Sequence, residues 1–367
     1  MEKQLKDYNK NNIFYKYINK AEKRNSIIKD IHFSIYISIK NKFIKINLKI
    51  VILFLFLIIY VNYYIFYVNQ NKKMKEINHK IDYEKNSFVI LRRTLCDACG
   101  LFSFYMVYLG CINNWITKGY IPIVDMKSFP NVYNNYKISN YNSWEIFFNQ
   151  PFGYTLEEII NNAKNKHYVE CYPVENRPNE ITIYDNQVLI DFWQNFAKKY
   201  MPIKKEIINK SYNIMKNLFY NSKNILGVKM RGTDYITNKM KGHSILPNLD
   251  TAIMDVKNFN EKNNYDYIFI STEDEIIKER FIKEFQNKIK ILNPNEKIHY
   301  NYKEGKPINL HNNIIGNLEY SKNYIYNIII LSKCTDIIMV RGNGACMVYL
   351  LNNQFRNVLI YNLGVYE

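Results

Sequence analysis

The residues best suited to chemistry follow a short apolar run in the second half of the chain. Ile225 to Val228 is too short for a helix and is typical of a buried parallel strand. In open α/β sheets, ligands gather beyond the carboxyl ends of the strands. An arginine there suits a phosphate or carboxylate, because its planar fork donates two parallel hydrogen bonds. Unless the strand end is polar by chance, the candidate site residues are Lys229, Arg231, Gly232, Thr233 and Asp234.

A second candidate is the turn formed by Gly342, Asn343 and Gly344, between an apolar run and a predicted helix. Its glycines allow close approach of the backbone, and the N–H groups and dipole at a helix start attract anions. The turn matches neither the P-loop pattern nor the dinucleotide fingerprint, and a plain tight turn is the alternative. Together with Arg231 it offers the charge and the N–H donors that a pyrophosphate needs.

A third candidate follows the predicted strand 265–271 and consists of Thr272, Glu273 and Asp274. One carboxylate could accept hydrogen bonds from a ribose hydroxyl or a base, as acids at strand ends do in nucleotide sites. Two carboxylates could instead hold a divalent metal under a diphosphate. The alternative to both is an acidic helix N-terminus placed to suit the helix dipole.

A parallel sheet is needed to bring these three turns together. The second half alternates short apolar runs with helical patterns at 249–262, 275–286, 323–333 and 345–352, which indicates repeated βα units. In the first half, a strand at 88–91, a helix at 104–118 and a strand at 120–124 form another such unit. The sequence therefore predicts an α/β protein with two Rossmann-like domains, residues 88–220 and residues 221–367.

The segments between these units are less regular. The aromatic segment 142–156 is expected to turn across the domain surface, with Thr155 capping a helix that begins at Leu156. We expect residues 161–185 to be irregular and residues 186–217 to be mainly helical, with a break at Pro202.

A membrane anchor is predicted ahead of these domains. Residues 1–48 form a basic tail, and residues 50–68 are uncharged and long enough to cross a hydrocarbon core. A buried helix of the globular domain is the alternative. We therefore predict one transmembrane helix, residues 49–69, and a linker, residues 70–87. Lysines flank both ends in equal number, and the longer basic tail leans toward a cytosolic N-terminus.

Charge and metal-ligand patterns exclude several function classes. The 367 residues carry a net charge of +17, but twelve basic and four acidic residues in the first 49 supply much of it. The remainder lacks any nucleic-acid-binding pattern, so no nucleic-acid partner is expected. Cys96 and Cys99 form one C-x-x-C pair, read as two free or disulfide-bonded thiols rather than a redox centre. The histidines lack metal spacing, and His243 alone lies in a short glycine-containing loop near Arg231.

Taken in order, these motifs resemble a known family. Residues 227–234, G-V-K-M-R-G-T-D, resemble the H-x-R-R-x-D motif of the fucosyltransferase superfamily, which has the GT-B fold and uses GDP-fucose. The strand Y-I-F-I-S-T-E-D at 267–274 and the segment 331–344 follow in the family's order, and W-E-I-F-F-N-Q-P at 144–151 resembles its bacterial members. The likeness covers about residues 88–361 and implies two Rossmann-like domains facing a cleft.

The resemblance also implies roles for individual residues. Arg231 matches the motif arginine that binds the donor's β-phosphate, and Asn343 with Gly344 falls where a turn meets the diphosphate. Gly100 and Leu101 stand where the family has a glycine loop, and His243 where it has a His-Pro-like loop. The chain departs from the family at Lys229, in place of a histidine, and at Gly232, in place of a second arginine. No acid occurs between residues 236 and 242, so no catalytic base is identified there.

From these observations we predict a membrane-anchored glycosyltransferase, an inverting enzyme that moves fucose from GDP-fucose to a glycan hydroxyl without a metal. Arg231 and Asp234 are its predicted catalytic residues, with Asp234 favoured as the group that orients Arg231. One alternative is a GT-A transferase that binds a metal through Glu273 and Asp274. Another is a catalytically inactive, membrane-tethered glycan-binding protein. The catalytic domain would face the cytosol in a bacterium and the Golgi lumen in a eukaryote, and the oligomeric state is not predicted.

Overall fold

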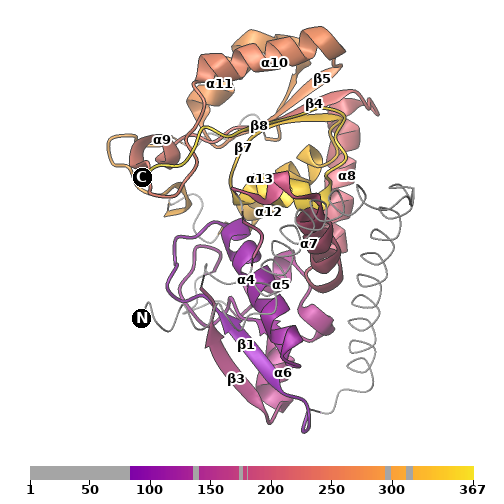
Figure 1. Cartoon of the computed structure of the whole chain (residues 1–367), viewed down its shortest axis with the longest axis vertical. Coiled ribbons are helices and arrows are strands. Elements are labelled where there is room, and N and C mark those ends of the chain that lie inside the picture. The colour runs from indigo at the N-terminus through magenta and orange to yellow at the C-terminus, as the bar shows by residue number, and fades with distance from the viewer. Residues whose placement is uncertain (1–82, 135–139, 173–176, 180, 294–298, 311–316) are drawn as a thin grey trace, which may run out of the picture. The chain divides into compact units, whose positions relative to one another are not determined.

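The structure, a computed structural model, describes residues 83–134, 140–172, 177–179, 181–293, 299–310 and 317–367 (Figure 1). The predicted tail, the predicted transmembrane helix at 49–69 and most of the predicted linker lie outside these residues. Within the described ranges, no helix is both long and apolar enough to cross a bilayer. Residues 83–367 form one compact unit, to which all the elements below belong.

The first of two parallel sheets has three strands in the order β2-β1-β3. They are β2 (Ile121–Val124), β1 (Phe88–Arg92) and β3 (Lys166–Glu170). α4 (Leu101–Thr117) connects β1 to β2, so the predicted βα unit is confirmed. The expected irregularity of residues 161–185 is wrong for β3, which pairs with β1 along its whole length. Its sequence, K-H-Y-V-E, lies at a sheet edge with half-exposed side chains and so carries little apolar pattern.

The aromatic segment 142–156 packs in the core instead of crossing the surface as expected. In α5 (Ser143–Phe147), Trp144 and Phe147 are fully buried. The side chain of Gln150 accepts a hydrogen bond from Val124 N at 2.8 Å and donates one to Val124 O at 2.7 Å, and Asn142 donates a second to the same oxygen at 2.8 Å. These amides satisfy the outer edge of β2, which has no neighbouring strand there, and so draw the segment inward.

Helices link the first sheet to the second. η1 (Pro151–Gly153) leads to α6 (Leu156–Asn162), and Thr155 caps α6 as predicted, within a capping box. η2 (Ile183–Asp185) precedes α7 (Gln187–Tyr200), and α8 (Lys205–Phe219) follows the predicted break at Pro202.

The second parallel sheet has five strands in the order β6-β5-β4-β7-β8. They are β4 (Ile225–Lys229), β5 (Tyr267–Ser271), β6 (Ile289–Lys290), β7 (Asp336–Val340) and β8 (Val358–Tyr361). All pairings are parallel, which confirms the predicted α/β class. The shorter elements of this half are α9 (Asp234–Asn238), η3 (Gln286–Lys288) and η4 (Ile308–Leu310).

Four longer helices cover the two faces of this sheet (Figure 1). α10 (Leu249–Asn263) and α11 (Glu275–Phe285) lie on one face, where Val256 and Phe281 join Leu226, Val228 and Ile268 in a buried cluster. α12 (Leu318–Leu331) and α13 (Asn343–Leu351) lie on the other face. Residue 227 is a glycine because a Cβ atom there would lie 2.6 Å from the side chain of Ile337.

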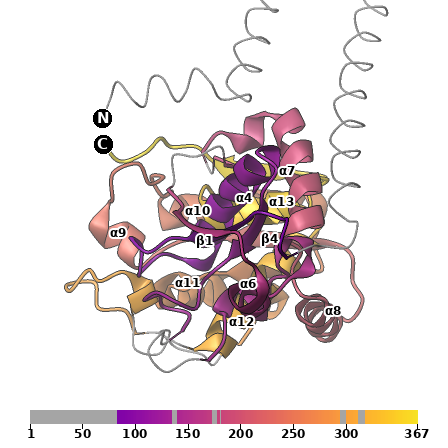
Figure 2. The same cartoon turned by 90° about the horizontal axis from the view of Figure 1, so that it is seen from below.

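Contacts between α4, α12 and α13 join the first sheet's elements to the second's. Cys346 Sγ lies 3.8 Å from Met106 Sδ, and the rings of Phe102 and Tyr324 are 5.1 Å apart. Figure 2 shows α4, α13 and α7 side by side. The start of α4 therefore lies against α12, beside the carboxyl edge of the second sheet.

Candidate functional site

The three polar turns predicted from the sequence meet at one edge of the second sheet. β4 lies between β5 and β7, and Lys229 is in register with Ser271 on one side and Met339 on the other. Because the three strands are parallel, their carboxyl ends emerge together. The residues that follow β4, β5 and β7 therefore face a common space, as the sequence suggested.

Arg231 is held between two carboxylates. Its Nη1 lies 3.0 Å from Glu273 Oε1 and its Nη2 lies 3.4 Å from Asp234 Oδ1, and its guanidinium carbon is 4.1 Å from the ring centre of Tyr235. Burial is the largest single influence and lowers the pKa of Arg231, but Glu273 and the smaller contributions of Tyr235 and Asp234 together outweigh it, and the pKa is raised. The side chain is 20% exposed and its Nε has no partner among the described residues. Arg231 is thus a fixed, permanently charged group.

The turn after Arg231 depends on Asp274. Thr233 N donates to Asp274 Oδ2 at 2.7 Å, and Tyr302 donates to the same oxygen through its hydroxyl. Asp274 Oδ1 accepts from Ile277 N at 3.1 Å and so caps α11. A Cβ atom at Gly232 would lie 2.1 Å from Asp274 Oδ2. This close approach explains why no second arginine is possible at position 232.

The acidic residues after β5 are therefore engaged by the protein itself. Glu273 binds Arg231 and also accepts from Gly232 N at 3.1 Å, while Asp274 has the three partners given above. Thr272 accepts from Asp274 N at 3.1 Å through its hydroxyl. In the described parts of the chain, no group of three or more His, Cys, Asp or Glu side chains is placed to hold a metal ion. The arrangement corresponds to the helix-cap alternative for Asp274.

Lys229 is the unpaired charge of the site. The residue is 4% exposed, and a Cβ atom at Gly344 would lie 2.7 Å from its Cε and 3.3 Å from its Nζ. Its ammonium makes no hydrogen bond or ion pair within the described residues, although the charge of Glu273 attracts it from farther away. Burial and, to a smaller extent, the charge of Arg231 lower the pKa of Lys229 to about 8. A buried cation without a partner is unfavourable, and an anion in reach of Nζ would relieve it.

The first turn of α13 lies directly against Lys229. Gly342 is the N-cap with φ 152°, a conformation that favours glycine, and no side chain caps the helix. The N–H groups of Asn343 and Gly344 belong to the unsatisfied first turn of the helix. Asn343 Oδ1 is buried and also lacks a partner among the described residues. A helix start and an unpaired ammonium on the same spot form an anion-binding arrangement.

Asp234 is placed to orient Arg231. It is buried at the start of α9 and accepts a hydrogen bond from Thr233 Oγ1 at 3.0 Å in addition to its contact with Arg231. Burial raises the pKa of Asp234, and the charge of Arg231 partly opposes that rise. Whether Asp234 orients Arg231 or acts as a base stays a prediction.

The remaining predicted site residues are His243, Gly100 and Leu101. The ring of His243 is 4.9 Å from the ring of Tyr235, and the guanidinium of Arg231 lies over that same tyrosine ring. His243 therefore packs against a neighbour of Arg231. Gly100 caps the start of α4, next to the disulfide between Cys96 and Cys99. Leu101 is buried in the core, with 1% of the residue exposed.

Two tyrosines of the site were missed by sequence reasoning. Tyr235 lies under Arg231, and the hydroxyl of Tyr324 would lie 2.5 Å from a Cβ atom at Gly344. Tyr235 directly follows the motif and could have been considered as its neighbour. Tyr324 comes from α12, more than ninety positions along the chain from Arg231, and nothing in the chain of 33 tyrosines distinguishes it.

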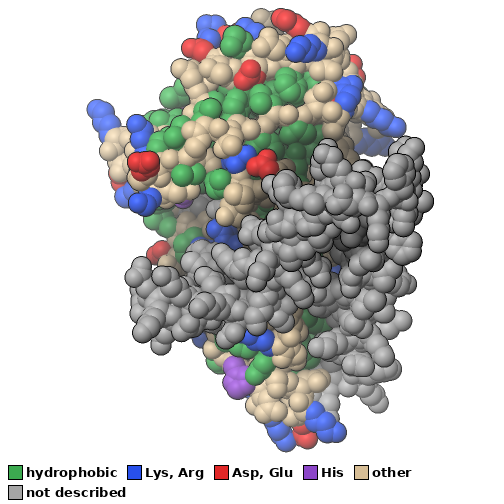
Figure 3. All heavy atoms as spheres, in the orientation of Figure 1, with side chains coloured by type: hydrophobic (Ala, Val, Ile, Leu, Met, Phe, Trp, Pro, Cys, Tyr) green, Lys and Arg blue, Asp and Glu red, His purple; other side chains and the backbone are tan. Residues whose placement is uncertain are grey.

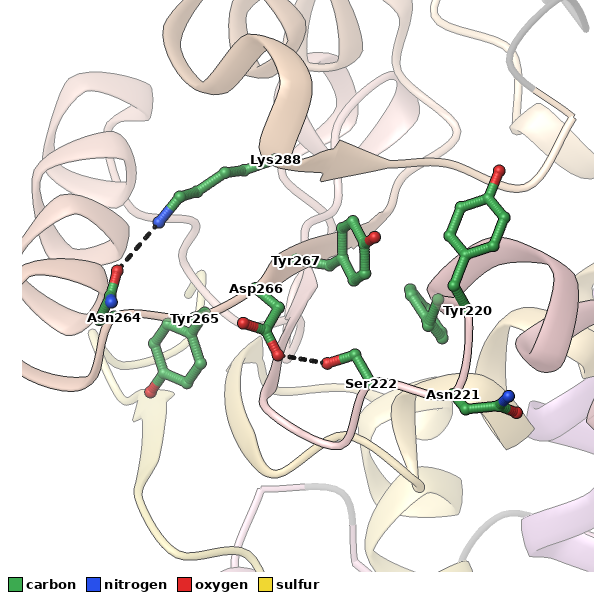
Figure 4. A pocket seen from close by; sticks show the side chains of 9 residues that line it. Tyr220, Asn221, Ser222, Asn264, Tyr265, Asp266, Tyr267 and Lys288 are labelled. Atoms are coloured by element: carbon green, nitrogen blue, oxygen red, sulfur yellow. Dashed lines mark hydrogen bonds between the residues drawn. The ribbon is translucent and has the colours of Figure 1, made fainter.

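A separate surface pocket of about 630 Å³ lies at the opposite end of β5 (Figure 4). It is lined by residues of the loops before β4, β5 and β6, including Tyr220, Asp266 and Lys288. Ser222 donates to Asp266 at 2.5 Å and Lys288 donates to Asn264 at 3.4 Å, so its polar groups bind one another. The pocket is open, and it lies at the amino edge of the sheet, away from the groups described above.

Surface charge gives no sign of a second, extended anion site on the face drawn in Figure 3. Acidic and basic side chains are interspersed over the described part of this face, around α10 and α11. Ion pairs on α10 and α11, such as Lys257 with Glu284 at 2.7 Å and Arg280 with Asp250 at 3.2 Å, also bring opposite charges together.

Comparison with known proteins gives likenesses of fold. No protein-family model and no curated protein sequence matches the chain. The structure is similar to NodZ α-1,6-fucosyltransferase soaked with GDP-fucose, with a TM-score of 0.44, 13% identity, and 73% of this chain and 93% of that chain covered. It is also similar to NodZ from Bradyrhizobium (TM-score 0.43, 14% identity, 73% and 94% covered) and to POFUT1 in complex with GDP-fucose (TM-score 0.37, 8% identity, 79% of both chains covered).

Replacing Arg231 with alanine is expected to destabilise the protein as well as the site. Glu273 and Asp234 would remain buried without their cation, which costs about 3–5 kcal/mol in the free energy of unfolding. The double variant Arg231→Ala, Glu273→Gln should recover much of that stability without recovering anion binding. Urea unfolding measures the first effect, and calorimetric titration with inorganic pyrophosphate measures the second.

The matched control is Arg280→Ala, which breaks the more exposed contacts of Arg280 with Asp250 and Glu284. It should cost less than about 1 kcal/mol and leave pyrophosphate binding unchanged. Full stability in Arg231→Ala would contradict the ion-pair arrangement described here.

The pKa of Lys229 predicts how anion binding depends on pH. Only the protonated ammonium attracts an anion, so the pyrophosphate affinity of the wild type, relative to Lys229→Met, should fall as pH rises through about 8. In the limit the fall is about tenfold per pH unit. Between about pH 8 and the ordinary value of 10.5, the unfolded chain holds more protons on Lys229 than the folded one, so stability should rise with pH there.

Calorimetric titrations at pH 7, 8 and 9 measure this ratio of affinities. Lys262→Met, at an exposed position near the end of α10, is the matched control and should follow the wild type at each pH. A ratio that stays constant from pH 7 to pH 9 would show that Lys229 does not bind the anion.

Proposed function

We propose that this chain is a glycosyltransferase whose donor is a nucleoside diphosphate sugar, bound by its diphosphate at the carboxyl edge of the second sheet. The observation that carries the proposal is the convergence of an unpaired, buried ammonium on the uncapped first turn of α13. Arg231 adds a second fixed cation beside it. Cation and free N–H donors together are what a diphosphate requires.

The spacing of the two cations suits a diphosphate better than a single phosphate. Lys229 and Arg231 are separated by one residue at the end of β4, which places them about 7 Å apart along an extended chain. Lys229 has no counter-ion among the described residues, whereas Arg231 is balanced by Glu273. One phosphate would then bind Lys229 and α13, and the other would lie toward Arg231.

In the proposed reaction, an acceptor hydroxyl attacks the anomeric carbon of the sugar from the face opposite the diphosphate. The bond between that carbon and the diphosphate oxygen breaks, and its electron pair leaves with the nucleotide. The hydroxyl proton is released to solvent as the glycosidic bond forms. Negative charge therefore grows on the diphosphate, where Lys229, Arg231 and the N–H groups of α13 are already in place. These groups supply the stabilisation that a metal ion supplies in other transferases.

The identity of the donor is the finer part of the proposal. The order of the three motifs, at 227–234, 267–274 and 331–344, supports GDP-fucose as the donor and a glycan hydroxyl as the acceptor. The same resemblance supports a GT-B arrangement, with residues 88–220 on the acceptor side and residues 221–367 on the nucleotide side. Asp234 is assigned the orientation of Arg231.

Membrane attachment completes the proposal. Residues 50–68 are uncharged and of spanning length, and we assign them as a single-pass anchor. The catalytic part would face the cytosol in a bacterium, where GDP-sugars are made, and the Golgi lumen in a eukaryote.

Turnover of GDP-fucose by the purified protein tests the proposed function. We expect release of GDP, slow with water and faster with a glycan acceptor, and unchanged activity in EDTA. Lys229→Met should lower the rate by at least about 100-fold, the loss found when one group that stabilises transition-state charge is removed. Lys262→Met should match the wild type.

The alternatives predict different results. Loss of activity in EDTA, restored by Mn²⁺, would favour the metal-dependent GT-A reading. Binding of a glycan without any turnover of a nucleotide sugar would favour the inactive glycan-binding protein. Equal turnover by Lys229→Met and the wild type would contradict the anion site as the donor site.

A further inference from the structure

Tyr324 contributes a second polar group to the same spot as Lys229. Its hydroxyl oxygen would lie 2.5 Å from a Cβ atom at Gly344, and Lys229 Nζ would lie 3.3 Å from it. Both groups therefore approach one point on the first turn of α13. Tyr324 reaches this point from α12, a different element from the one that carries Lys229.

The hydroxyl of Tyr324 has no hydrogen-bond partner in the part of the chain that the structure describes. Other tyrosine hydroxyls bond within the protein: Tyr105 donates to Met201 O at 2.9 Å, and Tyr361 donates to Asp255 at 2.8 Å. Tyr324 is half-buried and its oxygen is not one of the buried, unpartnered polar atoms of the described residues, so water can reach it. The hydroxyl is therefore free to donate to a ligand at this point, in place of water.

The surroundings of Tyr324 hold the ring and keep its hydroxyl protonated. The ring packs against Phe102, at the start of α4, with 5.1 Å between ring centres. Burial raises the pKa of Tyr324, the charge of Arg231 lowers it in part, and the charge of Glu273 raises it again. The net effect is a raised pKa, so the group is an O–H donor at neutral pH. A donor beside an ammonium suits an anion.

We infer that Tyr324 binds the donor's diphosphate directly, its hydroxyl donating a hydrogen bond to the phosphate group that Lys229 neutralises. This inference rests on the proposed function and adds a residue to it. Lys229 supplies the positive charge that attracts the phosphate. Tyr324 supplies a hydrogen bond that fixes the position of one phosphate oxygen, because its O–H is held on a packed ring. Gly344 is then required because a side chain there would displace both groups.

The geometry also separates this role from a purely structural one. Because the hydroxyl of Tyr324 bonds to no described residue, its removal should leave the folded protein unaffected. The hydroxyl of Tyr105 bonds to Met201 O inside the core, and its removal should lower stability without touching the site. The two tyrosine-to-phenylalanine variants therefore have opposite expected effects.

The test compares Tyr324→Phe and Tyr105→Phe with the wild type, by melting temperature and by calorimetric titration with GDP, inorganic pyrophosphate and guanosine. For Tyr324→Phe we expect an unchanged melting temperature and a loss of about ten- to a hundredfold in affinity for both GDP and pyrophosphate, as for a hydrogen bond to a charged group. For Tyr105→Phe we expect a lower melting temperature and unchanged affinities.

Three outcomes overturn the inference. If Tyr324→Phe binds pyrophosphate as the wild type does, the hydroxyl does not contact phosphate, even where GDP or guanosine binding is altered. If the melting temperature of Tyr324→Phe falls as that of Tyr105→Phe does, the hydroxyl has a structural partner. If the wild type binds neither GDP nor pyrophosphate, the proposed function itself fails, whereas wild-type binding with an unaffected Tyr324→Phe refutes the inference alone.

Discussion

The close approach of Lys229 to Gly344 is the contact on which the rest of the site depends. It places an ammonium against a helix start, where the dipole is already positive and the N–H groups lack partners. Such a placement is unfavourable for the charged ammonium, and burial lowers the pKa of Lys229 accordingly. Unfavourable local arrangements of this kind persist where a ligand completes them, at some cost in stability.

Glycine at two positions makes this geometry possible. At Gly344 the missing side chain leaves room for Lys229 and Tyr324, and at Gly232 it leaves room for the carboxylate of Asp274. Asp274 in turn caps α11 and holds the turn after Arg231. The site therefore depends on side chains that pack closely against glycine backbone at the strand ends. Asp274 stabilises this backbone by accepting hydrogen bonds from its N–H groups.

The charges of the site divide into two kinds. Arg231 is paired with Glu273 and touches Asp234, so its charge is largely balanced within the protein. Lys229 makes no direct ion pair among the described residues, and it therefore supplies most of the positive charge that a ligand would meet. From the sequence, Arg231 was expected to be the main anion-binding charge. In the structure Lys229 is better placed for that role, and Arg231 is a second cation held in a fixed position.

Much of the edge could be predicted from the sequence, because buried strands read as apolar runs and the polar turns follow them directly. Because the strands are predicted to be parallel, their carboxyl ends, and with them Lys229, Glu273 and Gly344, are expected at one edge of the sheet. Site residues contributed by a helix could not be predicted, because the sequence pattern of α12 does not show that Tyr324 faces Gly344. The segment 142–156 was misplaced because its core position depends on side-chain bonds from Gln150 to the edge of β2, which no local pattern records.

The central claim is that a nucleoside diphosphate binds where Lys229 meets the first turn of α13. A crystal structure of the protein soaked with GDP tests it most directly. The account predicts one phosphate within hydrogen-bond distance of Lys229 Nζ and of the N–H groups of Asn343 and Gly344. GDP bound elsewhere, with Lys229 still unpaired against Gly344, would contradict it.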